Sequence, residues 1–135
     1  YKVITDPSGR YMSLYKKWHL IGLELAVSVA SVGLRQEATG AAISFKGDVA
    51  AIAKRDLEAG EMLDGEGGYT VSGGLRPAEI SIARGYLPLG LAHKAKLIRP
   101  VKAGAAVTYA DVELDTSTAA YRLRQDIEKR HASKP

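Results

Sequence analysis

His19 is the ionisable residue that this sequence places most favourably for chemistry. Apolar residues recur at helical spacing from Leu14 to Arg35, which predicts a helix over this range. At about 100° per residue, His19 shares one side of that helix with Tyr15 and lies between two apolar stripes. This position predicts partial burial, where a histidine suits proton transfer or contact with a ligand. A hydrogen-bonded core histidine is the alternative interpretation.

Glu24 is a carboxylate close to His19 in the sequence. On the predicted helix it lies about 140° round from His19, on the polar edge with Lys17 and Ser28. We therefore expect Glu24 to be a solvated side chain rather than a second catalytic group.

A glycine-rich stretch from Gly65 to Tyr69 is the second candidate for a functional site. So many glycines leave backbone N–H groups able to face an anion. A phosphate-binding loop leads directly into a helix, however, whereas Tyr69-Thr70-Val71 is typical of a strand. We favour a turn that bends around a neighbouring element, and an anion-binding loop is the alternative.

Motifs for metals and dinucleotides are missing from the sequence. It has no cysteine, which excludes disulfides and thiolate metal sites, and its histidines at 19, 93 and 131 lack metal-ligand spacing. Neither G-x-G-x-x-G nor G-x-x-x-x-G-K-[ST] occurs as a strand–helix unit. No Ser/His/Asp arrangement can be argued either.

The predicted helix over 14–35 carries two apolar stripes instead of one: Leu14, Trp18, Ile21, Leu25, Val29 and Val32, and then Leu20, Leu23, Val27, Ala30 and Leu34. A surface helix of a small domain shows a single stripe, so this one needs partners on two sides. A membrane-spanning helix is excluded, because Lys17, His19, Glu24 and Arg35 leave too short an apolar core.

An internal repeat follows. Residues 53–63 align with residues 97–107 at an offset of 44, with arginine, alanine and glycine recurring in place. Each copy is predicted to be a strand, a turn at Ala-Gly and a short extended return. The two copies then pair as pseudo-symmetric halves of one β domain, each covering the apolar face of the other. Chance similarity over eleven positions is the alternative.

Turn and cap residues place the remaining elements. Pro77 starts a short helix that ends at Gly85, and Asp115 to Thr118 supply N-cap oxygens for a terminal helix. The fold class is therefore α+β: a long apolar helix, a small duplicated β domain and a C-terminal helix. We divide the chain into a helical segment (1–40), a linker (41–48), the β domain (49–115) and a terminal helix with a tail (116–135).

Composition limits the functional class. The chain has 135 residues, 46% of them hydrophobic and 25% charged, as in ordinary globular proteins. Its net charge of +4 is uneven, because residues 1–17 and 121–135 each carry +3 and the middle carries −2. Excess charge at the two ends argues against nucleic-acid binding. Since Tyr1 is not an initiator methionine, we expect the chain to be part of a longer cytoplasmic protein without a membrane anchor.

The repeat and the helix resemble known families. Residues 51–61, with their partner copy around 99–111, resemble a SAF domain, the β-clip module also found in antifreeze-like domains. Residues 15–24, 38–40 and 63–69 follow, in this order, the C-terminal part of bacterial NAD(P)-dependent oxidoreductases described as homoserine dehydrogenase-like. That group includes reductoisomerase-like enzymes acting on 1-deoxy-D-xylulose 5-phosphate in isoprenoid biosynthesis. The resemblance covers about residues 11 to 115 and departs at Lys17, where the family has proline.

This resemblance implies a parent enzyme whose Rossmann domain precedes this chain and binds NAD(P) outside it. A small phosphorylated or hydroxy-carbonyl substrate would accept the hydride there. His19 is then the candidate catalytic residue, and the candidate substrate-binding residues are Tyr15, Gly67, Gly68 and Tyr69. We expect a homodimer in which the SAF-like domain covers the active-site cleft. The resemblance leaves open the choice of NAD or NADP and any need for a divalent metal.

The alternative is a stand-alone SAF module that binds a sugar acid or a protein partner without redox chemistry. The two-sided apolar helix argues against such independence, because an isolated chain would expose a sizeable apolar patch.

Overall fold

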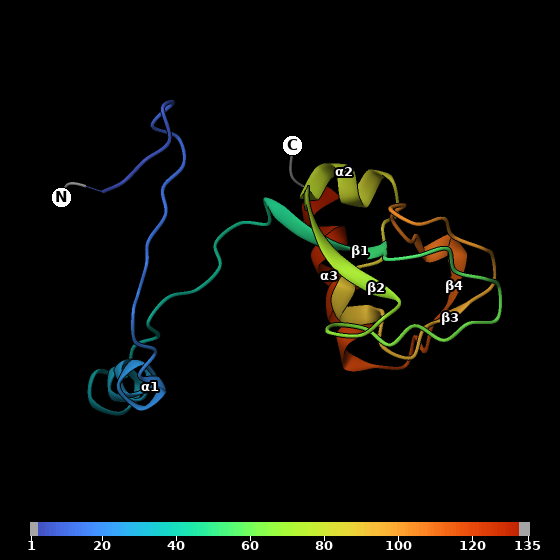
Figure 1. Cartoon of the computed structure of the whole chain (residues 1–135). Helices are drawn as coiled ribbons and strands as arrows, with labels where there is room; N and C mark the ends of the chain where they lie inside the picture. The colour runs from blue at the N-terminus through green and yellow to red at the C-terminus, as the bar shows by residue number, and fades with distance from the viewer. Residues whose placement is uncertain (1–2, 133–135) are drawn as a thin grey trace. The chain divides into compact units, whose positions relative to one another are not determined.

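A computed structural model describes residues 3–132 of the chain. The chain divides into two compact units, with the boundary between Ala42 and Ile43 (Figure 1). Together their elements make a mixed α+β chain with three α-helices and two two-stranded sheets among the described residues, which confirms the expected fold class.

A tight turn begins the described part of the N-terminal unit. The Asp6 carboxylate accepts hydrogen bonds from the Ser8 and Tyr11 backbone N–H groups, each at 3.0 Å. Gly9 takes the left-handed conformation that this turn requires, with φ +66°. The hydrogen bond from the Ser8 hydroxyl, followed by that from Tyr11, lowers the pKa of Asp6 from its ordinary value.

Helix α1 is shorter than the sequence predicts. It spans Ile21–Ala30 and continues as a wider π-helical turn, η1, over Ser31–Arg35, with Gln36 in the left-handed conformation at its end. Residues 14–20 are not helical, so the long apolar helix from Leu14 is not observed. No side chain caps the first turn of α1, and helices of this length are marginal without tertiary packing.

The C-terminal unit contains both sheets. Strand β1 (Gly47–Ala53) pairs antiparallel with β2 (Val71–Pro77), and the two lie side by side in Figure 1. The much shorter β3 (Lys96–Leu97) pairs antiparallel with β4 (Val112–Glu113). The core is made of small and medium aliphatic side chains: Ala51, Ala53, Leu57, Leu63, Val71, Leu87, Ala92, Ala95, Leu97, Val101, Val107 and Val112.

The two copies of the repeat bind each other symmetrically. Leu57 N–H donates to Val101 O at 2.8 Å, and Val101 N–H donates back to Leu57 O at 2.9 Å, although these residues are 44 positions apart. Three further pairs of backbone hydrogen bonds are related by the same offset: Ala53 N to Ala105 O with Leu97 N to Glu61 O, Gly60 N to Leu97 O with Gly104 N to Ala53 O, and Leu63 N to Ala95 O with Val107 N to Ala51 O.

The turn predicted at Ala-Gly is also the same in both copies. Gly60 and Gly104 have φ +92° and +78°, in the region that favours glycine. The matching turns and the paired hydrogen bonds show that the two copies have the same local structure. An alignment of eleven residues alone does not establish this.

Two α-helices and two 3₁₀ turns complete the described part of the C-terminal unit. Helix α2 (Ala78–Ala83) follows Pro77 and ends before Gly85, which has φ +61°, as the sequence predicts. Helix α3 (Ala119–Ala132) begins where Thr118 Oγ1 accepts a hydrogen bond from Tyr121 N–H at 3.2 Å, which confirms the predicted N-cap. The 3₁₀ turns η2 (Leu89–Leu91) and η3 (Tyr109–Asp111) are short connectors. Among the described helices, none has the length and apolar character that crossing a bilayer requires.

Candidate functional site

The glycine-rich stretch is a turn wrapped around a carboxylate of its own chain. Asp64 accepts hydrogen bonds from the backbone N–H of Tyr69 at 2.5 Å, from that of Thr70 at 3.1 Å, and from the Thr70 hydroxyl. The Thr70 hydroxyl and the Tyr69 amide hold the pKa of Asp64 to about 2. Asp64 therefore takes the place that an external anion would fill, and the structure favours the turn over the anion-binding loop.

Glycine is required at specific positions of this turn. A Cβ on Gly68 would lie 2.1 Å from the Asp64 carboxyl carbon, so either this carboxyl group or the turn would have to shift. Gly67 has φ +78°, and Gly65 has φ +76° with its missing Cβ directed at the Cβ of His93, 3.0 Å away. The sequence thus uses glycine here to bring the backbone close to a carboxylate and to a neighbouring segment.

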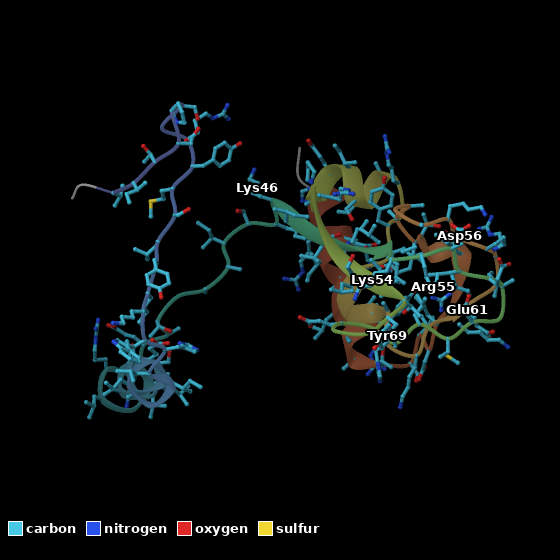
Figure 2. All side chains as sticks on the ribbon, viewed as in Figure 1. Lys46, Lys54, Arg55, Asp56, Glu61 and Tyr69 are labelled. Atoms are coloured by element: carbon cyan, nitrogen blue, oxygen red, sulfur yellow. The ribbon has the colours of Figure 1, made fainter. Side chains whose placement is uncertain are left out.

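The glycine turn presents Tyr69 to solvent. This side chain is 88% exposed, although its own N–H is tied to Asp64. Lys54, which follows β1, reaches the turn and donates a hydrogen bond to the Gly68 carbonyl (Figure 2). A rigid turn that displays one aromatic side chain beside a lysine suits contact with a ligand or a protein surface.

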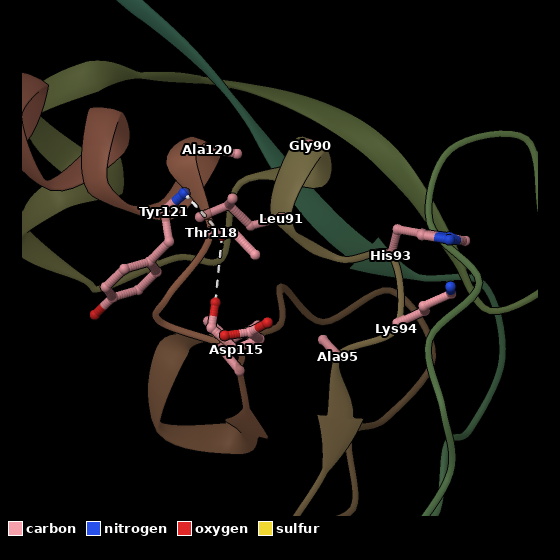
Figure 3. A pocket seen from close by; sticks show the side chains of 10 residues that line it. Gly90, Leu91, His93, Lys94, Ala95, Asp115, Thr118, Ala120 and Tyr121 are labelled. Atoms are coloured by element: carbon pink, nitrogen blue, oxygen red, sulfur yellow. Dashed lines mark hydrogen bonds between the residues drawn. The ribbon is translucent and has the colours of Figure 1, made fainter.

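A pocket of about 340 Å³ lies next to the glycine turn. His93 connects the two, because it lines the pocket and its Nδ1 is 3.3 Å from the Asp64 carbonyl oxygen. Figure 3 shows Thr118 between Asp115 and Tyr121, with its hydroxyl 3.3 Å from the Asp115 carbonyl oxygen. Leu91 and Ala95 add apolar surface to the wall, so the pocket combines apolar, hydroxyl and charged groups.

Lys94 forms part of the same wall with an uncommon backbone conformation. Its φ is +62°, which is rare for a residue with a side chain, and its N–H donates to Leu63 O at 2.9 Å. Residues held in such conformations cluster at ligand sites, where the surrounding structure imposes them.

A buried ion pair positions α3, whose start forms the pocket. Arg124 donates two hydrogen bonds to Asp48 of β1, at 2.8 and 2.6 Å, and a third to Glu128 at 2.6 Å. Burial raises the pKa of Asp48, but the hydrogen bonds from Arg124 and Ser81 outweigh burial and leave this pKa below its ordinary value. The linker predicted over residues 41–48 therefore ends in a residue that anchors the terminal helix.

His19 lies outside any helix and is exposed. Its side chain is 74% exposed, so the expected partial burial is wrong. Its Nδ1 lies 2.7 Å from Oε2 of Glu24, which also corrects the expectation that Glu24 faces away from it. The helical angle between the two residues does not apply, because α1 begins only at Ile21. Lys16 contacts the other oxygen of Glu24, and Tyr15 is exposed nearby in the sequence.

The candidate residues fall into both units. Tyr15 and His19 belong to the N-terminal unit, whereas Gly67, Gly68 and Tyr69 belong to the C-terminal unit. Within the second group the structure brings the residues together on one turn.

The glycine turn differs from a dinucleotide-binding loop. The glycine turn leads into β2 instead of a helix, and two of its N–H groups are bound by Asp64. This turn therefore lacks the helix N-terminus with which a dinucleotide-binding loop holds a pyrophosphate. Among residues 3–132, no cluster of three or more histidine, aspartate or glutamate side chains is placed to hold a metal ion.

No protein-family model matches this chain, and no curated protein matches it significantly.

Several residues of these sites were missed from the sequence. Asp64 and Thr70 could have been found as an aspartate next to a glycine run, because aspartate commonly bonds the backbone of a following turn. Lys54 and Tyr121 carried no comparable pattern, since each reaches its site only through the fold.

Proposed function

We propose that this chain is the C-terminal portion of an NAD(P)H-dependent oxidoreductase, either homoserine dehydrogenase-like or deoxyxylulose-phosphate reductoisomerase-like. The cofactor is bound by a Rossmann domain outside this chain. Residues 49–115 form a SAF-like β-clip that covers the active-site cleft. The helical segment of residues 1–40 contributes to the catalytic or dimer interface of this cytoplasmic enzyme.

The symmetric repeat supports the β-clip assignment. Two copies that exchange backbone hydrogen bonds at Leu57 and Val101, with glycine turns at equivalent places, form one duplicated β unit. The glycine turn and the pocket lie on this unit, where they are available to a substrate held against it.

The exposure of α1 is the observation that carries the proposal of a larger enzyme. Apolar side chains from Ile21 to Val29 are 60 to 69% exposed, and no residue of α1 is buried. A run of exposed apolar side chains on this scale marks an interaction surface. The parent's other domains and a second copy of the chain are the partners that we assign to it.

A direct assay tests the proposal. The natural gene product is purified at its full length, and NADH and NADPH oxidation is followed with small hydroxy-carbonyl compounds and 1-deoxy-D-xylulose 5-phosphate. Before that, an immunoblot against this chain gives the size of the product. A band of about 45 to 50 kDa leaves room for a dinucleotide-binding domain. A band at 14.4 kDa, the mass of the chain, would show that the gene product has no room for a cofactor domain, and it would overturn the proposed oxidoreductase function.

A stand-alone SAF module that binds a sugar acid or a protein partner is the second candidate. The pocket beside Asp115 and Thr118 favours it, because the C-terminal unit forms this pocket from its own residues. Under this alternative the 135-residue chain binds sugar acids at the pocket and remains a monomer at all concentrations. Self-association of the chain, with no binding of sugar acids, excludes a monomeric module that binds sugar acids.

A further inference from the structure

Strand β2 forms an open edge of its sheet. On the other side of that sheet, Ala51 of β1 donates its N–H to Leu87 O at 2.8 Å and accepts from Val107 N–H at 2.9 Å. Ala51 stands opposite Gly73, and antiparallel strands alternate between pairs that exchange hydrogen bonds and pairs that do not. Gly73 and its neighbours two positions away therefore direct their backbone groups away from β1. These outward residues are Val71, Gly73 and Leu75.

The outward groups have no partner strand. Among residues 3–132, none of the three outward N–H groups donates a hydrogen bond, and the one bond to an outward carbonyl runs from Arg76 Nη1 to Leu75 O at 2.9 Å. Ser72, Gly73 and Leu75 are exposed. An open edge of this kind is a template on which another extended chain can pair.

A second copy of β2 pairs all of these groups in one register only. In that register a two-fold axis passes at Gly73, so that Gly73 faces its own copy and Val71 faces Leu75 of the second copy. A shift by two residues in one direction brings in Pro77, which has no N–H. The same shift in the other direction brings in Tyr69, whose N–H is already donated to a carboxylate. A shift by one residue is excluded, because it brings in groups that are bonded to β1.

This register also covers apolar side chains that are exposed in a single copy. Leu75 is 73% exposed and Tyr69 is 88% exposed. Leu75 would stand opposite Val71 of the second copy and diagonal to its Tyr69, a separation that aromatic side chains can span. At the axis, Gly73 has no side chain to keep the two backbones apart.

Charges are complementary in the same register. Arg76 would stand opposite Thr70 of the second copy, whose hydroxyl and N–H bind the Asp64 carboxylate. In a single copy the Arg76 guanidinium bonds the Leu75 carbonyl, which the ladder between the copies needs. On pairing, Arg76 would exchange this neutral acceptor for a position beside a carboxylate, where its hydrogen bonds are stronger. The two-fold axis repeats this exchange on both sides.

We propose that two copies of this chain join edge to edge through β2, with a two-fold axis at Gly73, and form one continuous antiparallel sheet in the order β1–β2–β2–β1. Each copy contributes its two-stranded sheet. Val71, Gly73 and Leu75 of one copy then exchange backbone hydrogen bonds with Leu75, Gly73 and Val71 of the other. The interface lies in the C-terminal unit, and it does not depend on the proposed oxidoreductase function.

Amide hydrogen exchange tests the pairing directly. It is followed by NMR on the full chain from micromolar to millimolar concentration. We expect the Gly73 and Leu75 amides to exchange about tenfold more slowly, or slower still, once the dimer forms, because their N–H groups then gain partners. Ser72 and Gly74 are the controls on the same strand, since their amides face β1 and should be protected at every concentration. Exchange at Gly73 and Leu75 that does not change with concentration overturns the proposal, whether or not the chain associates elsewhere.

Substitutions at the edge should weaken the dimer. Leu75→Lys is expected to raise the dissociation constant about tenfold or more in sedimentation equilibrium, because charge on an edge strand opposes pairing. Arg76→Glu should have a similar effect, since it places a carboxylate beside Asp64 of the second copy. Leu123→Lys is the matched control, because Leu123 is 64% exposed on α3, and it should leave the dissociation constant unchanged. Equal effects of the two lysine substitutions overturn the proposal.

The register is tested by contacts between copies. In a mixture of isotope-labelled and unlabelled chains, filtered nuclear Overhauser spectra report only protons that belong to different copies. We expect contacts from the Leu75 methyl groups to the Tyr69 ring of the other copy. Contacts between copies that involve only residues of α1 would place the interface on that helix and overturn pairing through β2.

Discussion

Leu57 and Val101 occupy the same place in the two copies of the repeat, and each donates a backbone hydrogen bond to the other. A reciprocal pair between equivalent residues arises when a local two-fold axis passes between them. The axis also relates the two Ala-Gly turns at Gly60 and Gly104, and it lies within the aliphatic core of the C-terminal unit.

Hydrogen exchange should show the same symmetry. The amides of Leu57 and Val101 lie in one core and open together, so we expect them to exchange only on global unfolding and at rates within about tenfold of each other. The Gly60 and Gly104 amides should likewise match. Native-state exchange followed by NMR gives these rates. Fast exchange confined to one copy would show that the copies are not one cooperative unit.

Replacing Gly68 by alanine should destabilise the glycine turn strongly. The new Cβ would overlap the Asp64 carboxyl group, so the turn must open and the bonds from Tyr69 and Thr70 must break. We expect a loss of about 2 kcal/mol or more in the free energy of unfolding, measured by urea denaturation. Gly90→Ala is the control, because nothing lies within 4 Å of its added Cβ, and it should change stability by less than about 0.5 kcal/mol. Equal effects of the two substitutions would contradict the packing at Gly68.

Asp64 predicts a specific loss of stability in acid. Its pKa falls from 3.8 to about 2 on folding, so the ionised carboxylate stabilises the folded state above about pH 4. This contribution disappears as the pH falls from about 4 to about 2, where Asp64 becomes protonated in both states. Urea midpoints of the wild type and Asp64→Asn should therefore differ by a constant amount above pH 5 and converge below pH 4. A difference that does not narrow in acid would assign the stabilisation to another group.

The buried ion pair between Arg124 and Asp48 should matter far more than an exposed one. Both side chains are at most 10% exposed, and Arg124→Gln leaves Asp48 buried with an unpaired charge. We expect a loss of about 3 to 5 kcal/mol in the free energy of unfolding. Lys102→Gln breaks the exposed pair with Asp56, where the loss should be about 0 to 1 kcal/mol. Thermal unfolding of both variants provides the comparison, and similar losses would contradict it.

Elements that begin or end at a proline, a glycine or a capping side chain were predictable from the sequence. Pro77 and Gly85 bound α2, and Thr118 caps α3, because proline, glycine and threonine act through their own backbone geometry or side chain. The repeat was predictable for a similar reason, since the glycine in each copy marks a turn. Strands β3 and β4 have two residues each, which is too short for any alternation of polar and apolar residues.

The candidate sites were only partly predictable. Helical periodicity over residues 14–35 predicted a helix that begins at Leu14, whereas α1 begins at Ile21. The position of that start decides whether His19 meets Glu24. The glycine turn was identified from the sequence. The role of Asp64 was not, because it depends on how the folded backbone brings the Tyr69 N–H to the Asp64 carboxylate. The pocket brings together segments far apart in the chain, so no local pattern marks it.

The two-fold arrangement makes the C-terminal unit equivalent to a dimer of one short peptide whose two chains have been joined. Neither copy can pair its own backbone N–H and C=O groups, because their partners lie in the other copy. A peptide of one copy would therefore fold only at concentrations at which two peptides associate. When the two copies are joined in one chain, folding no longer depends on concentration, and the sequence of each copy can change independently of the other. In the turn of the second copy, Ala103 N–H donates a hydrogen bond to the Asp56 carboxylate at 2.9 Å. The residue of the second copy that corresponds to Asp56 is Pro100, which has no carboxylate. In the turn of the first copy, Glu58 N–H donates to the Glu61 carboxylate instead. Divergence of this kind lets the two copies differ in the contacts that hold their turns while both keep the same backbone pairing.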